Sequence, residues 1–146
     1  LSQAATHTPK WQAGFGPEFL NREDGFPGLA KAYNLKFASQ PKVMDLGLLY
    51  RSLQAKEVDI VAGSTTDGLL STLDLTILQD DKRYFPPYEA AAVVRRETFQ
   101  KHPELREILD QLGGMISNKT MQELNYRVDG KKEDVKQVVQ DFLKSK

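Results

Sequence analysis

The sequence contains no cysteine and only two histidines among its 146 residues. Without cysteine there is no disulfide, no thiolate nucleophile and no cysteine-based zinc site, whatever the cellular compartment. Lysine plus arginine equals aspartate plus glutamate, with 20 of each, so the formal net charge is zero. A chain without a basic excess is a poor match for nucleic-acid phosphates, and we expect no nucleic-acid partner. No apolar run approaches the roughly 20 residues that a membrane-spanning helix needs.

Residues that could carry catalysis are equally scarce. His7 and His102 lie in polar surroundings beside expected helix ends, which is typical of surface histidines. Asp80 and Asp81 are adjacent, so their carboxylates point in different directions and are more typical of turns and caps than of an acid–base pair. The hydroxyls of Ser64–Thr66 have no nearby base that the sequence identifies. We therefore expect no catalytic residue, no metal site, no cofactor and no enzymatic activity.

The chain is organised around residues 57–88. Val58–Ala62 is an apolar run that predicts a buried strand, and it ends in the small polar residues Gly63–Gly68. A polar loop at the end of a buried strand is how an α/β domain presents binding residues. Leu73–Leu78 predicts a further strand. Tyr84–Tyr88 contains two adjacent prolines, which fix the backbone and donate no hydrogen bond, so this segment predicts a stiff connector.

Strands and helices alternate along the first two thirds of the chain. This order predicts an α/β fold with a small, mostly parallel sheet flanked by helices. The other expected strands are Lys10–Gly14, Lys42–Leu46 and Ala90–Val94. The expected helices between them are Glu18–Asn21, Phe26–Tyr33 and Leu48–Ala55.

After Arg95 the pattern becomes helical. Pro103 is expected to begin one helix, and Ser117 is expected to cap the next. The last helix carries an apolar stripe at helical spacing, formed by Val135, Val138, Val139, Phe142 and Leu143. These helices need an apolar surface to pack on, either on the sheet or outside this sequence.

Two residues indicate binding. Arg22 follows a short helical turn, where its guanidinium could hold a carboxylate through two parallel hydrogen bonds. Tyr88 ends the stiff aromatic segment, and a tyrosine face attracts a quaternary ammonium ion through its quadrupole. Each residue also has an ordinary interpretation, because Arg22 suits a surface ion pair and Tyr88 suits the edge of a core.

Several motifs together resemble the second lobe of the substrate-binding proteins of osmoprotectant ABC transporters. Those proteins take up glycine betaine, choline, carnitine and related quaternary amines. The resemblance covers nearly the whole chain, and its motifs occur in the same order as in the family. They are Pro17–Arg22, Asp24–Gly25, Gly28–Leu29, Val58–Val61, Thr65–Gly68, Leu78–Lys82, Phe85–Tyr88 and Met121–Tyr126.

The resemblance implies a lobe like those of type II periplasmic binding proteins, in which two α/β lobes enclose a ligand cleft. Residues 1–88 would form the second, ligand-binding lobe. Residues 89–146 would be a crossover strand and carboxyl-terminal helices that pack on the first lobe, which is expected to precede this sequence with about a hundred residues. Without that lobe, a homodimer or a segment swap is expected to cover the apolar stripes.

The resemblance also implies a binding site. Arg22 would bind the ligand carboxylate, Tyr88 would be one wall of an aromatic cage, and Ser64, Thr65 and Asp67 would lie at the cleft. Several family members have a second cage tyrosine where this chain has Ser64. The chain therefore departs from the family pattern, which implies weaker binding, a different cation or a ligand that is not a betaine.

The resulting functional prediction is a solute-binding module of an ABC importer. Its partners would be a small quaternary amine and a permease subunit or fused permease domain. It would act in the periplasm or at the cell surface, associated with the membrane through the transporter. The alternative is a ligand-sensing or protein-docking module on the same fold.

Overall fold

The computed structural model describes residues 1–145, which form two compact units. Unit 1 consists of Leu1–Ser64 and Thr76–Pro86, and unit 2 consists of Thr65–Leu75 and the chain from Pro87 onward. Within the described chain, the backbone therefore passes from one unit to the other after Ser64, Leu75 and Pro86.

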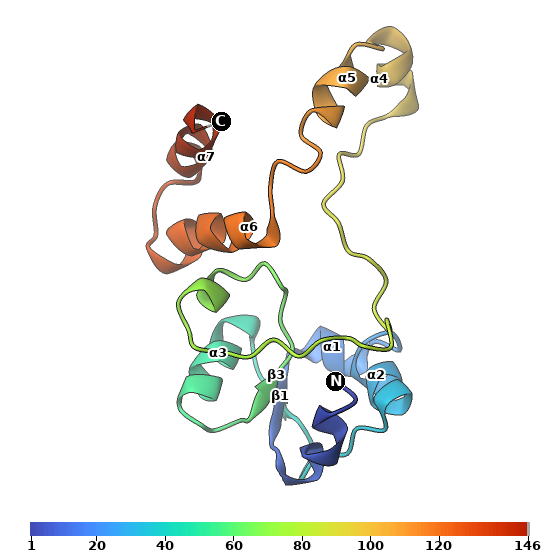
Figure 1. The fold of residues 1–146 in the computed structure, drawn as a ribbon, viewed down its shortest axis with the longest axis vertical. Coiled ribbons are helices and arrows are strands. Elements are labelled where there is room, and N and C mark those ends of the chain that lie inside the picture. The colour runs from blue at the N-terminus through green and yellow to red at the C-terminus, as the bar shows by residue number, and fades with distance from the viewer. Residues whose placement is uncertain (146) are drawn as a thin grey trace. The chain divides into compact units, whose positions relative to one another are not determined.

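Unit 1 is built on a small parallel sheet. Its strands in the described residues are β1 (Ala13–Phe15), β2 (Lys42–Val43) and β3 (Ile60–Val61). The order is β2-β1-β3, and β1 pairs with both neighbours in parallel. Figure 1 shows β1 and β3 side by side. Because β1 lies between β2 and β3 and is parallel to both, the carboxyl ends of the three strands point the same way.

Local sequence explains where the helices of unit 1 begin and end. Pro17 occupies the first turn of α1, where a missing N–H costs nothing. Asn34 ends α2 in the left-handed conformation, with φ of 53°, which asparagine tolerates better than most residues. The helical elements of this unit are η1 (Ala4–Thr6), η2 (Thr8–Lys10), α1 (Pro17–Asn21), α2 (Phe26–Tyr33) and α3 (Leu46–Gln54).

The core of unit 1 is aromatic on one side of β1. Phe15 is buried, and its ring lies 4.9 Å from that of Phe26 and 5.2 Å from that of Phe19, measured between centroids. Such tilted and edge-on pairs stabilise beyond the burial of their area. The helix α3 contacts β1 and β3, and it buries Leu49 and Tyr50. This packing fixes α1, and therefore the residue that follows it, to the end of β1.

Unit 2 is helical. Its elements are η3 (Gly68–Ser71), α4 (Arg96–Lys101), α5 (Leu105–Asp110), α6 (Asn118–Asn125), the π-helical turn η4 (Tyr126–Gly130) and α7 (Val135–Lys144). The Ser117 side chain accepts a hydrogen bond from the Thr120 N–H, which confirms its predicted capping role. Arg127 ties η4 to α7 through ion pairs with Glu133 and Asp141.

The structure confirms the α/β fold and the parallel sheet, but two predicted strands are wrong. Leu73–Leu78 and Ala90–Val94 both lack strand structure, and Figure 1 shows the second of them as an irregular thread. Their apolar composition is strand-like, yet a strand also needs a neighbour for its backbone hydrogen bonds. The sheet of the described chain has β2 and β3 at its edges and includes neither segment.

Gly28 offers a test of how tightly α2 is packed. A Cβ at this position would lie 2.1 Å from the Tyr84 hydroxyl and 2.4 Å from the Glu23 carbonyl oxygen. We expect Gly28→Ala to lower the free energy of unfolding by about 1–3 kcal/mol, because a backbone atom must move.

The matched control is Gly47→Ala in α3, where a Cβ meets nothing within 4 Å. That variant should gain stability, by up to about 1 kcal/mol, from the better helix propensity of alanine. Urea unfolding of both variants checks the pair, and equal effects of the two substitutions would contradict the packing described for Gly28.

Candidate ligand-binding site

Arg22 is held at the end of α1 by the way that β1 leads into this helix. Phe15 ends β1, Gly16 caps the helix with extended backbone, and Pro17 opens it. The Arg22 N–H still donates to the Glu18 carbonyl, so Arg22 is the residue at which the helix stops. Arg22 therefore follows the short helix that continues from the carboxyl end of the central strand.

The guanidinium of Arg22 makes a two-pronged contact with a carboxylate. Its Nε lies 2.8 Å from Oδ1 of Asp24, and its Nη2 lies 2.5 Å from Oδ2. The hydrogen bond from Arg22 holds the pKa of the Asp24 carboxyl below its ordinary value. The Arg22 side chain is 58% exposed. Arg22 thus has the fork geometry that suits a carboxylate, and Asp24 already uses it.

Ser64 lies at the same edge of the sheet as α1. The strands β1 and β3 run parallel, with Gly14 opposite Val61. The segments that follow them therefore leave the sheet at one edge, and these segments are α1 after Phe15 and residues 62–64 after Val61. Ser64 is exposed and is the last residue of this part of unit 1.

Thr65 and Asp67 belong to unit 2, where they lie in a loop held by α6. The Gln122 side-chain amide donates to the Thr65 carbonyl over 2.7 Å, and the Asn125 amide donates to the Thr66 carbonyl over 2.8 Å. Asp67 precedes η3 and is half-buried, whereas Thr65 is exposed. The loop is therefore fixed to a helix more than fifty residues further along the chain.

Tyr88 also belongs to unit 2, and its side chain is 92% exposed. It lies in residues 87–95, which have neither helix nor strand structure. Of the predicted site, Arg22 and Ser64 thus lie in unit 1, and Thr65, Asp67 and Tyr88 lie in unit 2.

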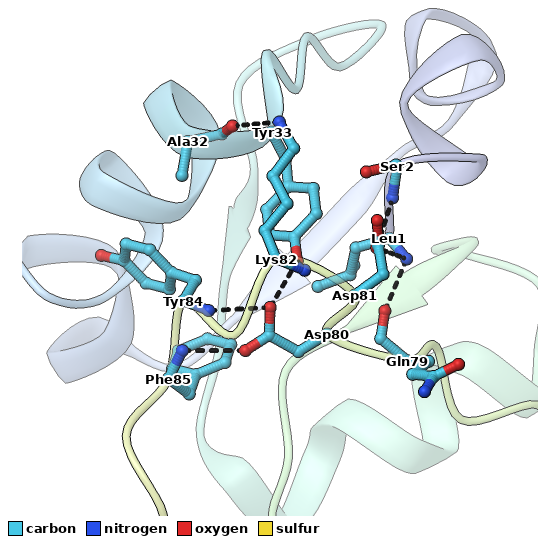
Figure 2. Close-up of polar contacts among 10 residues, drawn as sticks. All are labelled: Leu1, Ser2, Ala32, Tyr33, Gln79, Asp80, Asp81, Lys82, Tyr84 and Phe85. Carbon is cyan, nitrogen blue, oxygen red and sulfur yellow. Dashed lines mark hydrogen bonds and ion pairs between the residues drawn. The ribbon is translucent and has the colours of Figure 1, made fainter.

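The segment that leads to Tyr88 is anchored in unit 1 by the Asp80 carboxylate. Figure 2 shows Asp80 accepting hydrogen bonds from the hydroxyl of Tyr33 and from the backbone of two following residues. The Tyr84 N–H lies 3.0 Å from Oδ1, and the Phe85 N–H lies 2.8 Å from Oδ2. Asp80 was predicted to serve in a turn, and this contact set confirms that role.

These contacts change the pKa values of both partners. Burial alone would raise the pKa of Asp80, but hydrogen bonds from Tyr33, Phe85 and Tyr84 outweigh it and hold the pKa below its ordinary value. Burial raises the pKa of Tyr33, and the hydrogen bond to Asp80 raises it further. The Asp80 carboxylate therefore stays ionised and Tyr33 stays neutral over the physiological range.

The neighbouring residues extend the same anchor. Asp81 accepts a hydrogen bond from the Ser2 N–H over 3.0 Å, and contacts with Ser2 keep the pKa of Asp81 well below its ordinary value. Lys82 donates from its backbone to the Tyr33 hydroxyl and from Nζ to the Ala32 carbonyl, as Figure 2 shows. Residues 79–85 are therefore tied to α2 and to the first residues of the chain.

The anchored segment also supports the loop that carries Arg22. The ring of Phe85 lies 6.4 Å from that of Phe19 in α1. The Tyr84 hydroxyl lies 3.5 Å from the carbonyl oxygens of Glu23 and Gly25. Phe85 and Tyr84 thus contact residues that precede and follow Arg22 in the sequence.

Other predicted features have simple surroundings. His7 and His102 are both exposed, as expected, and His102 pairs with Glu104. Across residues 1–145, no group of three or more histidine, aspartate or glutamate side chains is arranged to hold a metal ion. No helix in that part of the chain is both long and apolar enough to cross a membrane.

Sequence reasoning missed the roles of Gln122 and Asn125. Both residues belong to a motif that carried the family resemblance, but the motif gave them no structural role. Their spacing was a usable signal, because residues three apart lie on one face of a helix and two amides there can grip a neighbouring backbone.

The model of the family described as the substrate binding domain of the ABC-type glycine betaine transport system matches residues 1–145. The chain belongs to this family. The family consists of transport substrate-binding proteins rather than enzymes, and in ABC importers such proteins act outside the cytoplasm.

Named relatives and a solved structure agree with this assignment. The chain is 41% identical over 143 residues to the ergothioneine transport permease/ergothioneine binding protein EgtU of Helicobacter pylori, covering 98% of this chain and 26% of that protein. It is 41% identical over 132 residues to the carnitine transport binding protein OpuCC of Listeria monocytogenes, covering 90% of this chain and 42% of that protein.

The crystal structure of a glycine betaine/carnitine/choline ABC transporter superposes with a TM-score of 0.88 at 39% identity, covering 99% of this chain and 53% of that one. The family resemblance and the type II binding-protein fold expected from the sequence are therefore confirmed. The chain spans about half the length of the solved relative and less than half of the curated relatives.

The Asp80 anchor predicts a pH-dependent stability. We expect Asp80→Asn to lower the free energy of unfolding at pH 7, because a neutral amide accepts the three hydrogen bonds less strongly. The carboxyl has a lowered pKa in the folded state, so its contribution is complete above the unfolded value of about 3.9 and is lost as the pH falls through the folded value.

The difference in the free energy of unfolding between wild type and Asp80→Asn should consequently shrink as the pH falls from 5 to the lowest pH at which the protein folds. Urea unfolding across that range measures it. Asp45→Asn is the control, since Asp45 is exposed and makes no side-chain cap contact. A pH-independent difference for Asp80→Asn would show that its charge does not matter.

Proposed function

We propose that the chain is the solute-binding module of an ABC importer for a quaternary-ammonium compatible solute such as glycine betaine, choline or carnitine. The observation that carries this proposal is the family match along residues 1–145. The names of two relatives, a carnitine transport binding protein and an ergothioneine binding protein, support the same class of ligand. The module would deliver its solute to a permease subunit or to a fused permease domain.

The proposed mechanism uses the residues that the family resemblance assigns to the ligand site. Arg22 would clamp the ligand carboxylate, and its contact with Asp24 supports this role because it has the required fork geometry. Tyr88 would attract the ammonium group through its ring face, and its exposure leaves the ring accessible. Ser64, Thr65 and Asp67 would border the ligand, with closure of the binding protein completing the site.

We further propose that residues 1–88 belong to the ligand-binding lobe and that the helices of residues 89–146 pack on the other lobe of the complete protein. Relatives about twice as long or longer support the existence of that lobe. Unit 2 supports it too, because large apolar side chains are exposed on its helices and on the segment between α5 and α6. They are Ile108, Leu112, Ile116, Val135, Val139 and Leu143. In the isolated chain, a homodimer or a segment swap would cover them.

Calorimetric titration tests the proposed function. The 146-residue chain and the complete binding protein are each titrated with glycine betaine, choline, carnitine, ergothioneine and proline, and the solution mass of both is measured. We expect binding by the complete protein alone, because the chain supplies only part of the site. Binding by neither protein would favour the alternative of a docking module, and a monomeric mass for the isolated chain would exclude the homodimer and the swap.

Replacing Arg22 tests whether this residue binds the carboxylate of the ligand or its ammonium group. In the complete protein, Arg22→Ala should raise the Kd for glycine betaine roughly 10- to 100-fold, because a charge-assisted hydrogen-bonded pair is lost. Choline has no carboxylate, so its affinity should change little. Arg22→Lys keeps the charge without the fork and should be intermediate for glycine betaine. Equal losses for both ligands would remove Arg22 from the proposed role.

A further inference from the structure

Two amide side chains of α6 hold the backbone of residues 65–67, the candidate ligand loop. Gln122 donates to the Thr65 carbonyl and Asn125 donates to the Thr66 carbonyl. Both donors therefore act on the two peptide groups directly before Asp67. A loop with little regular structure needs such contacts, because fewer of its peptide groups are paired within a helix or a sheet.

The grip is reinforced where the loop enters η3. A Cβ on Gly68 would lie 2.5 Å from the Tyr126 backbone nitrogen and 2.8 Å from the Asn125 carbonyl carbon. The backbone at Gly68 therefore lies directly against the end of α6, closer than any other residue would allow. Gly68 is also buried, so the loop is fixed on the side that follows Asp67 as well as on the side that precedes it.

The end of α6 is itself held in place. The π-helical turn η4 continues the helix, and its Arg127 donates to Glu133 and to Asp141 of α7 over 2.7 Å each. Asp141 also accepts from Gln137 over 2.7 Å. The helix that grips the loop is thus connected by charged hydrogen bonds to α7, which gives the two amides a fixed base.

We propose that Gln122 and Asn125 are positioning residues that set ligand affinity by fixing the conformation of residues 65–67. This inference rests on the proposed function, since it assigns the two amides to the same binding site. Neither side chain needs to touch the ligand. Their contribution arises because a loop that is already ordered loses less conformational entropy when the ligand binds.

The test is Asn125→Asp in the complete binding protein, with glycine betaine as the probe. The new carboxylate has the shape of the amide but presents an oxygen to the Thr66 carbonyl, so the hydrogen bond becomes a repulsion. We expect the Kd to rise at least roughly tenfold. Gln122→Glu should act in the same direction.

The matched control is Asn118→Asp, which makes the same chemical change on the exposed first residue of the same helix. Its Kd should stay within about twofold of wild type. The midpoint of thermal unfolding is measured for every variant, because a purely structural role for Asn125 would lower that midpoint and leave the Kd of the folded protein unchanged.

A double-mutant cycle with Asp67→Ala shows whether Asn125 acts through the loop. If it does, the effect of Asn125→Asp should be much smaller when Asp67 is already replaced. Hydrogen exchange at the amides of residues 65–70 supplies an independent measurement, and we expect faster exchange in Asn125→Asp than in Asn118→Asp.

The outcomes separate this inference from the proposed function. Wild type that binds glycine betaine, together with an Asn125→Asp variant that binds equally well, would overturn the positioning role alone. Wild type that binds no quaternary amine would overturn the proposed function and the affinity role with it. Additive effects in the cycle would also contradict action through the loop.

Discussion

The parallel pairing of β1 between β2 and β3 is the constraint on which unit 1 depends. Parallel neighbours bring their carboxyl ends to one edge of a sheet, and in this unit those ends lead to α1 and to residues 62–64. The strands are short, so pairing alone stabilises them little. Packing of Phe15 against Phe19 and Phe26 adds the apolar contacts that a short sheet needs. The position of Arg22 is therefore a consequence of the core rather than of its own loop.

Outside the sheet, side chains replace secondary structure in holding the backbone. Asp80 accepts from the peptide groups of Tyr84 and Phe85, and the amides of Gln122 and Asn125 donate to the peptide groups of the loop at Thr65. In unit 1 the carboxylate lies four and five residues before the peptide groups that it holds, whereas in unit 2 the amides lie more than fifty residues further along the chain. This solution suits a binding protein, because a loop can present its own side chains while its backbone remains satisfied.

The sequence predicted the parts of the fold that depend on local pattern and missed those that depend on distant partners. The strands at Ala13–Phe15, Lys42–Val43 and Ile60–Val61 overlap their predicted ranges, because each contains an aromatic or β-branched residue near turn residues. Leu73–Leu78 has the same local character but no place in the sheet. Nothing in a short apolar run reveals whether another strand lies beside it, so the local sequence pattern could not exclude this strand.

The candidate site likewise contains residues that the sequence singled out and supporting residues that it did not. Arg22 and Tyr88 were predicted as ligand residues from their residue types and from the family resemblance, because a fork of donors and an aromatic face have recognisable chemistry, and their roles remain predictions. The supporting residues were not identified, since an amide that binds a backbone carbonyl looks like any polar residue on a helix. Only Asp80 was assigned correctly, because an aspartate that binds the backbone a few residues ahead is a local feature.

The contact between Arg22 and Asp24 affects how selective the proposed site can be. A ligand carboxylate that engages the same Nε and Nη2 donors must replace Asp24, so its gain is the difference between two similar pairs. The pair with Asp24 is largely exposed, and exposed pairs are weak because water screens them. A pair formed in a closed, water-poor cleft is stronger. Selectivity for a carboxylate would therefore come from closure around the ligand together with Arg22, rather than from Arg22 alone.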